Sequence, residues 1–381
     1  MPGGVLTGTD LSAVEAVLSD LAQLFAEAGY LPVKPRHLFA ADRLLDLYGE
    51  DIRTRAFLFP DPEQQGELCL RPDFTVPVAL AHGAVGWDRP ASYAYAGPVF
   101  RRQAAETHRP IEYLQAGVEN FGALDRSTAD ATVFALMLRG LDVIGVGERR
   151  IETGDLGIVF ALLDALSMPE HRRWSLRRHV WRPRRFQTLL ETFGRVAPRP
   201  SPRRAALLSA VEAGEDAVAA LALDAGEPVG LRGLDEVADR ARDLRRQMDE
   251  PPLAAEQIAL VEAVLALSAP SGTALSRLRE ITVAANVDIT AALDRFEARL
   301  DALNRIGIDA EELPFSAAFG RSLEYYDGFV FEIRARGPDL PPLAGGGRYD
   351  AMTSRLGARR PVPAVGAMIR PEAAVAAGAE R

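Results

Sequence analysis

Residues 113–121 read YLQAGVENF, a stretch in which apolar and polar side chains alternate. Because successive side chains of a strand point to opposite faces, the apolar residues 114, 116 and 118 share one face and can pack on a core. Gln115, Gly117 and Glu119 share the other face. A glycine in mid-strand weakens a strand unless another group approaches the backbone. The pattern indicates either a ligand amino group lying over Gly117 or a polar face in solvent, and these residues alone leave both open.

A second strand is predicted just before this one. Residues Ala91–Phe100 and Glu112–Phe121 have the texture of a hairpin, with a long connection over residues 102–111. Long connections in compact domains are more often functional than short ones. Arg101, where the first strand ends, is a candidate partner for a ligand carboxylate or phosphate, because its planar fork matches two oxygens. A surface arginine at a strand end would look the same in the sequence.

Further upstream, Asp73 and Thr75 lie between a predicted strand and a predicted helix. Residues 53–59 and 66–70 are expected to pair as strands around a proline-rich turn, and residues 75–82 to form the helix. Either side chain could cap that helix, which is the more common role. A buried carboxylate at this position could instead receive an ammonium group.

Tyrosines and glycines recur near the end of the chain, in residues 320–328 (GRSLEYYDG) and 343–350 (LAGGGRYD). Successive glycines are costly in conformational entropy and persist where the backbone approaches a ligand or another strand. The triplet lacks the lysine and hydroxyl residue of a P-loop. Taken singly, Tyr325, Tyr326 and Tyr349 could be ordinary packing residues. Alternation along residues 321–325 predicts that Arg321 and Tyr325 share a face.

The remaining sequence divides by texture into two parts. Helical spacing of apolar residues predicts helices over residues 11–25 and 127–143, and strand texture returns at 315–319 and 328–335. Residues 205–303 have helical spacing, many helix formers and few strand formers. We therefore expect an α+β fold, an antiparallel sheet flanked by helices. Residues 1–170 and 306–381 would form it, and residues 171–305 would be a mostly helical insertion.

Composition restricts the classes of function. The chain of 381 residues has a net charge of −9 and a single cysteine, Cys69. One thiol forms neither an intrachain disulfide nor a zinc site, and no apolar run is long enough to span a membrane, so a cytoplasmic protein without a metal ion is expected. A basic patch over residues 172–185 is expected to be a solvated face. We predict no membrane or nucleic-acid partner, because nucleic-acid binders usually carry a basic footprint.

Taken together, these segments resemble the catalytic core of histidine–tRNA ligases, a class II aminoacyl-tRNA synthetase fold. Residues 71–75 (RPDFT) look like that family's Arg-Pro-Glu-Gly-Thr segment, and residues 100–115 look like its second signature motif. Residues 321–326 (RSLEYY) are similar to its Arg-Gly-Leu-Asp-Tyr-Tyr motif, and residues 345–350 to its second histidine motif. The resemblance covers residues 10–165 and 315–372, and several motifs in one order are far more specific than any one alone.

The resemblance implies a histidine-binding site whose residues have three kinds of role. Asp73, Thr75, Gln115 and Glu119 would hold the amino group or the imidazole, and Arg101 would face the carboxylate. The residues expected to enclose and position the ring are Arg321, Tyr325, Tyr326 and Tyr349.

Two departures from the ligase pattern concern catalysis, and a third concerns tRNA recognition. The ligases have a glutamate that serves the adenine of ATP where this chain has Gln103, and an ungapped match puts Ala373 at the place of their phosphate-binding arginine. Arg370 could fill that place only with a gap, and Pro371 would then be expected to interrupt the following helix. The sequence also ends directly after this motif, so no anticodon-binding domain is expected.

A histidine pocket without ATP machinery resembles the regulatory subunits of ATP phosphoribosyltransferase. That resemblance implies a non-catalytic subunit without a cofactor, needed for the first step of L-histidine biosynthesis and for feedback regulation by histidine. Its partner would be a short-form catalytic subunit, and the chain would be a homodimer within a hetero-oligomer. The alternatives are a truncated histidine–tRNA ligase-like enzyme that activates an amino acid and a synthetase-like RNA-binding protein.

Overall fold

The structure is a computed structural model that describes residues 8–42, 50–63, 66–103, 110–196, 201–214, 234–320, 325–336 and 340–378. The chain forms two compact units, the first from Met1–Leu166 with Leu260–Arg381 and the second from Ser167–Ala259. This division differs from the expected boundary at residue 305. Residues 260–305 belong to the first unit, because helix α14 (Thr290–Arg305) packs along helix α5 (Arg126–Ile144).

The first unit contains a nine-stranded sheet with the order β1-β5-β6-β12-β11-β10-β7-β9-β8. Neighbouring strands are antiparallel except for the pairs β1–β5 and β7–β9. In chain order the strands are β1 (Leu31–Pro32), β5 (Ala91–Phe100), β6 (Glu112–Phe121), β7 (Arg149–Asp155), β8 (Ser268–Pro270), β9 (Pro314–Ser316), β10 (Phe329–Ala335), β11 (Ala344–Arg348) and β12 (Ala364–Ile369). The predicted hairpin is confirmed, with β5 and β6 pairing from Ala91↔Phe121 to Phe100↔Glu112.

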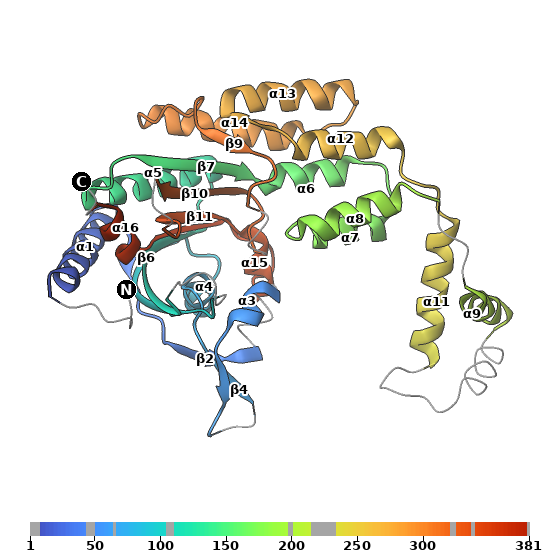
Figure 1. Ribbon diagram of the computed structural model, residues 1–381, viewed down its shortest axis with the longest axis horizontal. Helices are drawn as coiled ribbons and strands as arrows, with labels where there is room; N and C mark the ends of the chain where they lie inside the picture. The colour runs from blue at the N-terminus through green and yellow to red at the C-terminus, as the bar shows by residue number, and fades with distance from the viewer. Residues whose placement is uncertain are drawn as a thin grey trace. The chain divides into compact units, whose positions relative to one another are not determined.

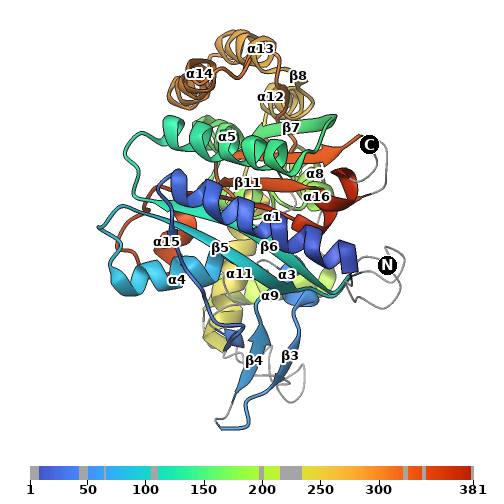
Figure 2. The same cartoon turned by 90° about the vertical axis from the view of Figure 1, so that its left-hand side faces the viewer.

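Helices cover one face of this sheet (Figures 1 and 2). Helix α1 contacts β5 and β6, α5 contacts β11 and β12, and α16 contacts β6. The helices of the first unit besides α5 and α14 are α1 (Gly8–Glu27), α3 (Glu50–Arg55), α4 (Thr75–Val85), α6 (Leu156–Ala165), α13 (Ser271–Ala284), α15 (Asp350–Arg355) and α16 (Pro371–Gly378). Helix α12 (Ala255–Leu265) spans the boundary between the two units.

The start and end of α5 follow from its sequence. The side chain of Asp125 accepts a hydrogen bond from the backbone N–H of Thr128 at 3.0 Å, as N-cap residues do. Gly145 ends the helix with a φ of 84°, a left-handed conformation that glycine adopts without steric cost. The helix predicted over residues 127–143 is therefore confirmed, as is the one predicted over residues 11–25, which lies within α1.

A small three-stranded sheet has the order β2-β4-β3 (Figure 2). Its strands are β2 (Leu38–Ala40), β3 (Leu58–Pro60) and β4 (Glu67–Leu70). The expected strand over residues 53–59 was wrong in its first half, because Arg53 and Arg55 lie in the last turn of α3. The expected pairing is real from Leu58 onwards, where β3 runs antiparallel to β4.

The second unit is helical in its described residues. Its helices are α7 (Glu170–Arg178), α8 (Pro183–Phe193), α9 (Pro202–Ala213) and α11 (Leu234–Asp249). The basic patch is not uniformly solvated, because Arg172 is buried and donates to the carbonyl of Pro251 at 2.8 Å. Trp174 is 57% exposed, and the guanidinium of Arg178 lies 5.2 Å from the centre of its ring.

A buried charge cluster ties the helical layer of the first unit to its sheet. Arg348 of β11 donates from Nη2 to Asp130 of α5 at 2.7 Å and from Nη1 to Asp350 at 2.8 Å. Arg299 of α14 lies 2.8 Å from Asp155, where β7 ends. Removing one partner from such a cluster leaves a buried charge uncompensated, which is costly. The cluster therefore fixes β11, and the tyrosine that follows it, against α5.

Candidate functional site

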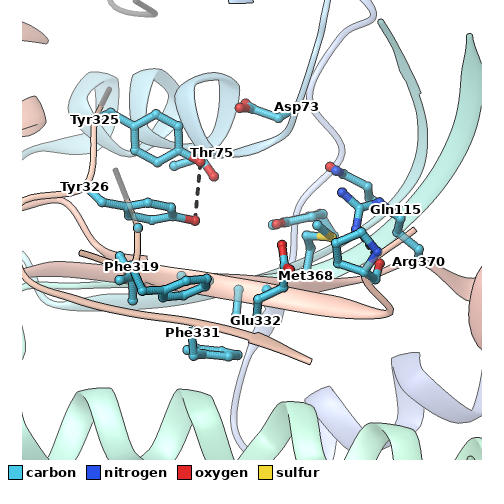
Figure 3. Close-up of a pocket in the computed structure, with 18 of the residues that line it drawn as sticks. Asp73, Thr75, Gln115, Phe319, Tyr325, Tyr326, Phe331, Glu332, Met368 and Arg370 are labelled. Atoms are coloured by element: carbon cyan, nitrogen blue, oxygen red, sulfur yellow. Dashed lines mark hydrogen bonds between the residues drawn. The ribbon is translucent and has the colours of Figure 1, made fainter. Parts of the chain in front are cut away.

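A cavity opens on the sheet between the segment that precedes α4 and the ends of β10 and β12 (Figure 3). Its volume is about 110 Å³, which is smaller than the roughly 300–1,000 Å³ of sites for drug-sized ligands. The lining residues are Asp73, Thr75, Tyr95, Arg101, Gln115, Phe319, Gly320, Tyr325, Tyr326, Val330, Phe331, Glu332, Pro342, Gly345, Gly346, Gly366, Ala367, Met368 and Arg370.

Six of the nine residues predicted for the site line this cavity. They are Asp73, Thr75, Arg101, Gln115, Tyr325 and Tyr326. Glu119 and Tyr349 do not line it, because both side chains are fully buried beneath its floor. Arg321 lies outside the described residues, as do the other residues of 321–324.

Glu119 connects the cavity floor to the core through three hydroxyl groups. The hydroxyl of Thr75 donates to Oε1 of Glu119 at 2.8 Å, and that of Tyr95 is 3.5 Å from the same oxygen. The hydroxyl of Tyr349 donates to Oε2. Burial raises the pKa of Glu119 to about 8, although these hydrogen bonds favour the charged form. The carboxyl group thus holds Thr75 and Tyr349 in place and can carry a proton near neutral pH.

The space over Gly117 is filled by protein. A β-carbon at this position would lie 2.6 Å from the hydroxyl of Tyr95 and 2.3 Å from the carbonyl of Ala367. Neither Gly117 nor Glu119 faces solvent. The interpretation that a ligand lies over Gly117 was therefore wrong, since Tyr95 takes that place. The solvated polar face is also excluded, because Gln115 is only 2% exposed.

The segment before α4 is held by a buried arginine. Arg71 donates from Nε to the carbonyl of Pro98 at 2.9 Å and from Nη1 to that of Pro35 at 2.8 Å. Its guanidinium lies 4.0 Å from the centre of the Phe74 ring, which stacks on Tyr95 at 4.3 Å. These contacts fix the backbone on both sides of Asp73, so that its carboxylate reaches the cavity from a rigid segment.

Arg101 and Asp73 form a polar corner of the cavity. Nη2 of Arg101 is 3.7 Å from Oδ2 of Asp73, and Nε donates to the carbonyl of Pro72 at 2.6 Å. The N-cap residue of α4 is Phe74, which makes no side-chain cap hydrogen bond.

Two tyrosines form the aromatic end of the cavity. The rings of Tyr325 and Tyr326 lie 4.5 Å apart, and their hydroxyl groups are 3.4 Å apart. Burial raises the pKa of Tyr326, so its hydroxyl remains protonated. Tyr326 reaches this position because Gly347 has no side chain, and a β-carbon there would lie 2.8 Å from its ring. The glycine triplet therefore forms strand β11 and admits this ring.

Residues at the end of β12 also line the cavity, and sequence reasoning did not assign them to it. Gly366, Met368 and Arg370 alternate along the strand and beyond its end, so their side chains share a face. That period-two pattern is the signal that could have found them. Pro371 does not interrupt a helix, because it is the first residue of α16, where proline is tolerated.

The cavity has two chemically different ends. Figure 3 shows Thr75, Tyr325 and Tyr326 at one end and Gln115 and Arg370 at the other. A carboxylate and hydroxyl groups suit an ammonium or a ring N–H, and guanidinium groups suit an oxyanion. The arrangement can therefore hold a small zwitterion with an aromatic or heteroaromatic side chain.

A family model described as histidyl-tRNA synthetase matches residues 6–251 and 218–374. The chain is 37% identical to an ATP phosphoribosyltransferase regulatory subunit of Mesorhizobium japonicum, over 93% of this chain and 95% of that protein. The protein of the same name from Rhizobium meliloti is 35% identical over 95% and 97% of the two chains. The chain belongs to the ATP phosphoribosyltransferase regulatory subunit family. The sequence-based recognition of this family is confirmed.

Solved structures agree on the fold of this regulatory subunit family member. A structure described as an ATP phosphoribosyltransferase regulatory subunit/histidyl-tRNA synthetase from Bacillus halodurans superposes with a TM-score of 0.68 and 22% identity, over 99% of this chain and 82% of that one. A histidyl-tRNA synthetase from Nostoc gives 0.62 at 14% identity, over 99% and 74%. The predicted class II synthetase-like α+β fold is confirmed. Within the described residues, every helix is too short or too polar to cross a bilayer.

Proposed function

We infer that this chain is the non-catalytic regulatory subunit of an ATP phosphoribosyltransferase, which serves the first step of L-histidine biosynthesis. The regulatory subunits from Mesorhizobium and Rhizobium match it over more than nine-tenths of both chains, so the inference concerns the whole protein and not one shared domain. A catalytic phosphoribosyltransferase chain is then its partner. We place the complex in the cytoplasm, where a protein with one buried cysteine keeps its thiol reduced.

We propose L-histidine as the ligand of the cavity. In this proposal Asp73 and Thr75 would receive the amino group, and Arg101 and Gln115, which also line the cavity, would face the carboxylate. Tyr325 and Tyr326 offer ring faces and hydroxyl groups to an imidazole. In this proposal Glu119 and Tyr349 act indirectly, because they hold Thr75 and the floor in position.

The division of the cavity into an end with the hydroxyl groups of Thr75, Tyr325 and Tyr326 and an end with Gln115 and Arg370 carries this ligand proposal. The positions expected to serve ATP in the ligases do not support nucleotide chemistry. Gln103 has no carboxylate to offer, and Ala373 is a buried residue of the first turn of α16. Transfer of a phosphoryl group depends on electrostatic stabilisation, so Gln103 and Ala373 at these two positions favour binding over catalysis.

We also propose that the chain forms a homodimer within a hetero-oligomer and that its first unit, which contains the cavity, senses histidine. Feedback regulation then requires that histidine binding and the catalytic partner's activity share a coupling free energy.

Thermal unfolding with and without ligands tests the pocket. L-histidine at about 100 times its dissociation constant should add about 2.7 kcal/mol and raise Tm by a few degrees. ATP alone should leave Tm unchanged. The absence of any shift with millimolar histidine, in a correctly folded sample, would exclude histidine as the ligand of this cavity.

A further inference from the structure

Arg370 occupies a fixed position at the edge of the cavity. Its backbone N–H donates to the carbonyl of Leu343 at 2.8 Å, and Pro371 begins α16 directly after it. Nη1 donates to the carbonyl of Pro342. The guanidinium also lies 5.7 Å from the centre of the Tyr113 ring. These contacts orient the planar group, and Figure 3 shows it beside Gln115 at the end of the cavity opposite the tyrosines.

The charge of Arg370 is only partly compensated by the protein around it. Among the described residues, no carboxylate forms an ion pair with Arg370, whereas Arg101 has Asp73 at 3.7 Å. The nearest acidic group in the lining, Glu332, is paired with Arg334 at 2.6 Å. Burial is the largest influence and lowers the pKa of Arg370, and the charge of Arg101 also lowers it, whereas Tyr113 and Glu332 raise it in part. Of the two carboxylates in the lining, Asp73 lies beside Arg101 and Glu332 beside Arg334, so neither forms an ion pair with Arg370.

An incompletely matched guanidinium in a cavity is costly unless a ligand supplies the opposite charge. A guanidinium has five N–H donors, so the bonds of Arg370 with Pro342 and Tyr113 leave donors for the oxygens of a ligand. Gln115 lies next to it and can donate a further hydrogen bond to the same group. The chemistry at this end is that of a carboxylate site.

We propose that Arg370 binds the α-carboxylate of the amino-acid ligand and thereby makes the cavity selective for the free amino acid over its alcohol or amide. This inference rests on the proposed histidine-binding function. Arg370, which follows β12, would then be a specificity residue. The end of the cavity beside Gln115 would hold the ligand's carboxylate and not a separate anion. Arg370, Arg101 and Gln115 would then surround the carboxylate, so the cavity would bind the free amino acid more tightly than derivatives without a carboxylate.

Calorimetric titration of the full-length chain with L-histidine and with L-histidinol, which lacks the carboxylate, tests the proposal. The wild-type chain should bind histidine about ten- to a hundredfold more tightly, the range of one charge-assisted hydrogen-bonded pair. In Arg370→Met this preference should shrink to a fewfold, while the affinity for histidinol stays within about twofold. Arg195→Met, which removes a highly exposed arginine, is the matched control and should keep the full preference.

Each other result has a distinct meaning. An undiminished preference in Arg370→Met would overturn the carboxylate assignment and leave histidine binding intact. Binding of neither compound to the wild-type chain would overturn the proposed ligand itself. Inorganic phosphate that binds together with histidine, and only when Arg370 is present, would show that Arg370 serves a separate anion. If Arg370→Met does not unfold cooperatively, Arg370→Lys replaces it in the titration. This variant should lose affinity for histidine and keep its affinity for histidinol, because lysine lacks the planar fork of arginine.

Discussion

At the residue scale, the buried carboxyl group of Glu119 should give the folding stability a measurable pH dependence. Because its pKa is raised from 4.5 to about 8, the folded protein retains a proton that the unfolded chain loses between these pH values. Stability therefore falls as the pH rises from about 4.5 to about 8. Glu119→Gln mimics the protonated form. In this variant the free energy of unfolding should fall less with rising pH, by up to about 4 kcal/mol.

Urea unfolding of both proteins at pH 5 and pH 8 measures this difference. The quantity to compare is the change in unfolding free energy between pH 5 and pH 8 in each protein. Burial also raises the pKa of Asp327, to about 7, so both proteins lose some stability over this range through Asp327. Equal changes in the wild-type chain and the variant would mean that Glu119 is ionised in the folded protein throughout this range.

A second prediction at this scale concerns the contact between Gly117 and Tyr95. Gly117→Ala places a β-carbon 2.6 Å from the tyrosine hydroxyl and should cost about 1–3 kcal/mol through overpacking. Gly345→Ala is the matched strand control, because its β-carbon would meet only the carbonyl of Phe331 at 3.4 Å. Denaturant midpoints of the two variants measure the effect, and equal midpoints would show that both Tyr95 and the carbonyl of Ala367 give way at little cost.

At the scale of elements, the buried cluster that joins β11 to α5 should be sensitive to loss of one member. Arg348→Met leaves Asp130 and Asp350 without their shared partner and should destabilise the protein by about 3–5 kcal/mol. Arg336→Met removes an exposed pair with Glu148 and should change stability by less than about 1 kcal/mol. Similar unfolding free energies for both variants would refute a structural role for the cluster.

The same scale shows what the sequence can and cannot predict. The hairpin of β5 and β6 was predicted with its observed bounds, because alternation and chain reversal are local signals. Residues 53–55 were assigned to a strand although they end α3, since a short stretch without strong periodicity does not distinguish the two. The division at residues 259–260 was missed because α14 is identified with the first unit only by its packing on α5.

The sequence predicted those residues of the site that belong to recognisable motifs. Asp73, Gln115 and Tyr326 were identified in this way and do line the cavity. Tyr95 and Arg370 were not assigned to it, because their proximity to the cavity depends on strands that are distant in sequence and adjacent only in the sheet. Which face of β6 a ligand could reach likewise depended on where the Tyr95 ring lies.

At the scale of the whole molecule, the account requires a protein that binds histidine and acts only through a partner. Its regulatory relatives match nearly its full length, and the solved ligases share its fold. The fold alone therefore does not distinguish a regulator from an enzyme. The distinction rests on which macromolecule the intact chain binds.

The most direct test is affinity purification of the tagged full-length chain from the native extract, followed by identification of what is bound. The account predicts co-purification of a short phosphoribosyltransferase catalytic chain whose ATP phosphoribosyltransferase activity depends on the tagged chain. Recovery of tRNA alone, together with histidine-dependent exchange of pyrophosphate into ATP by the purified chain, would contradict it.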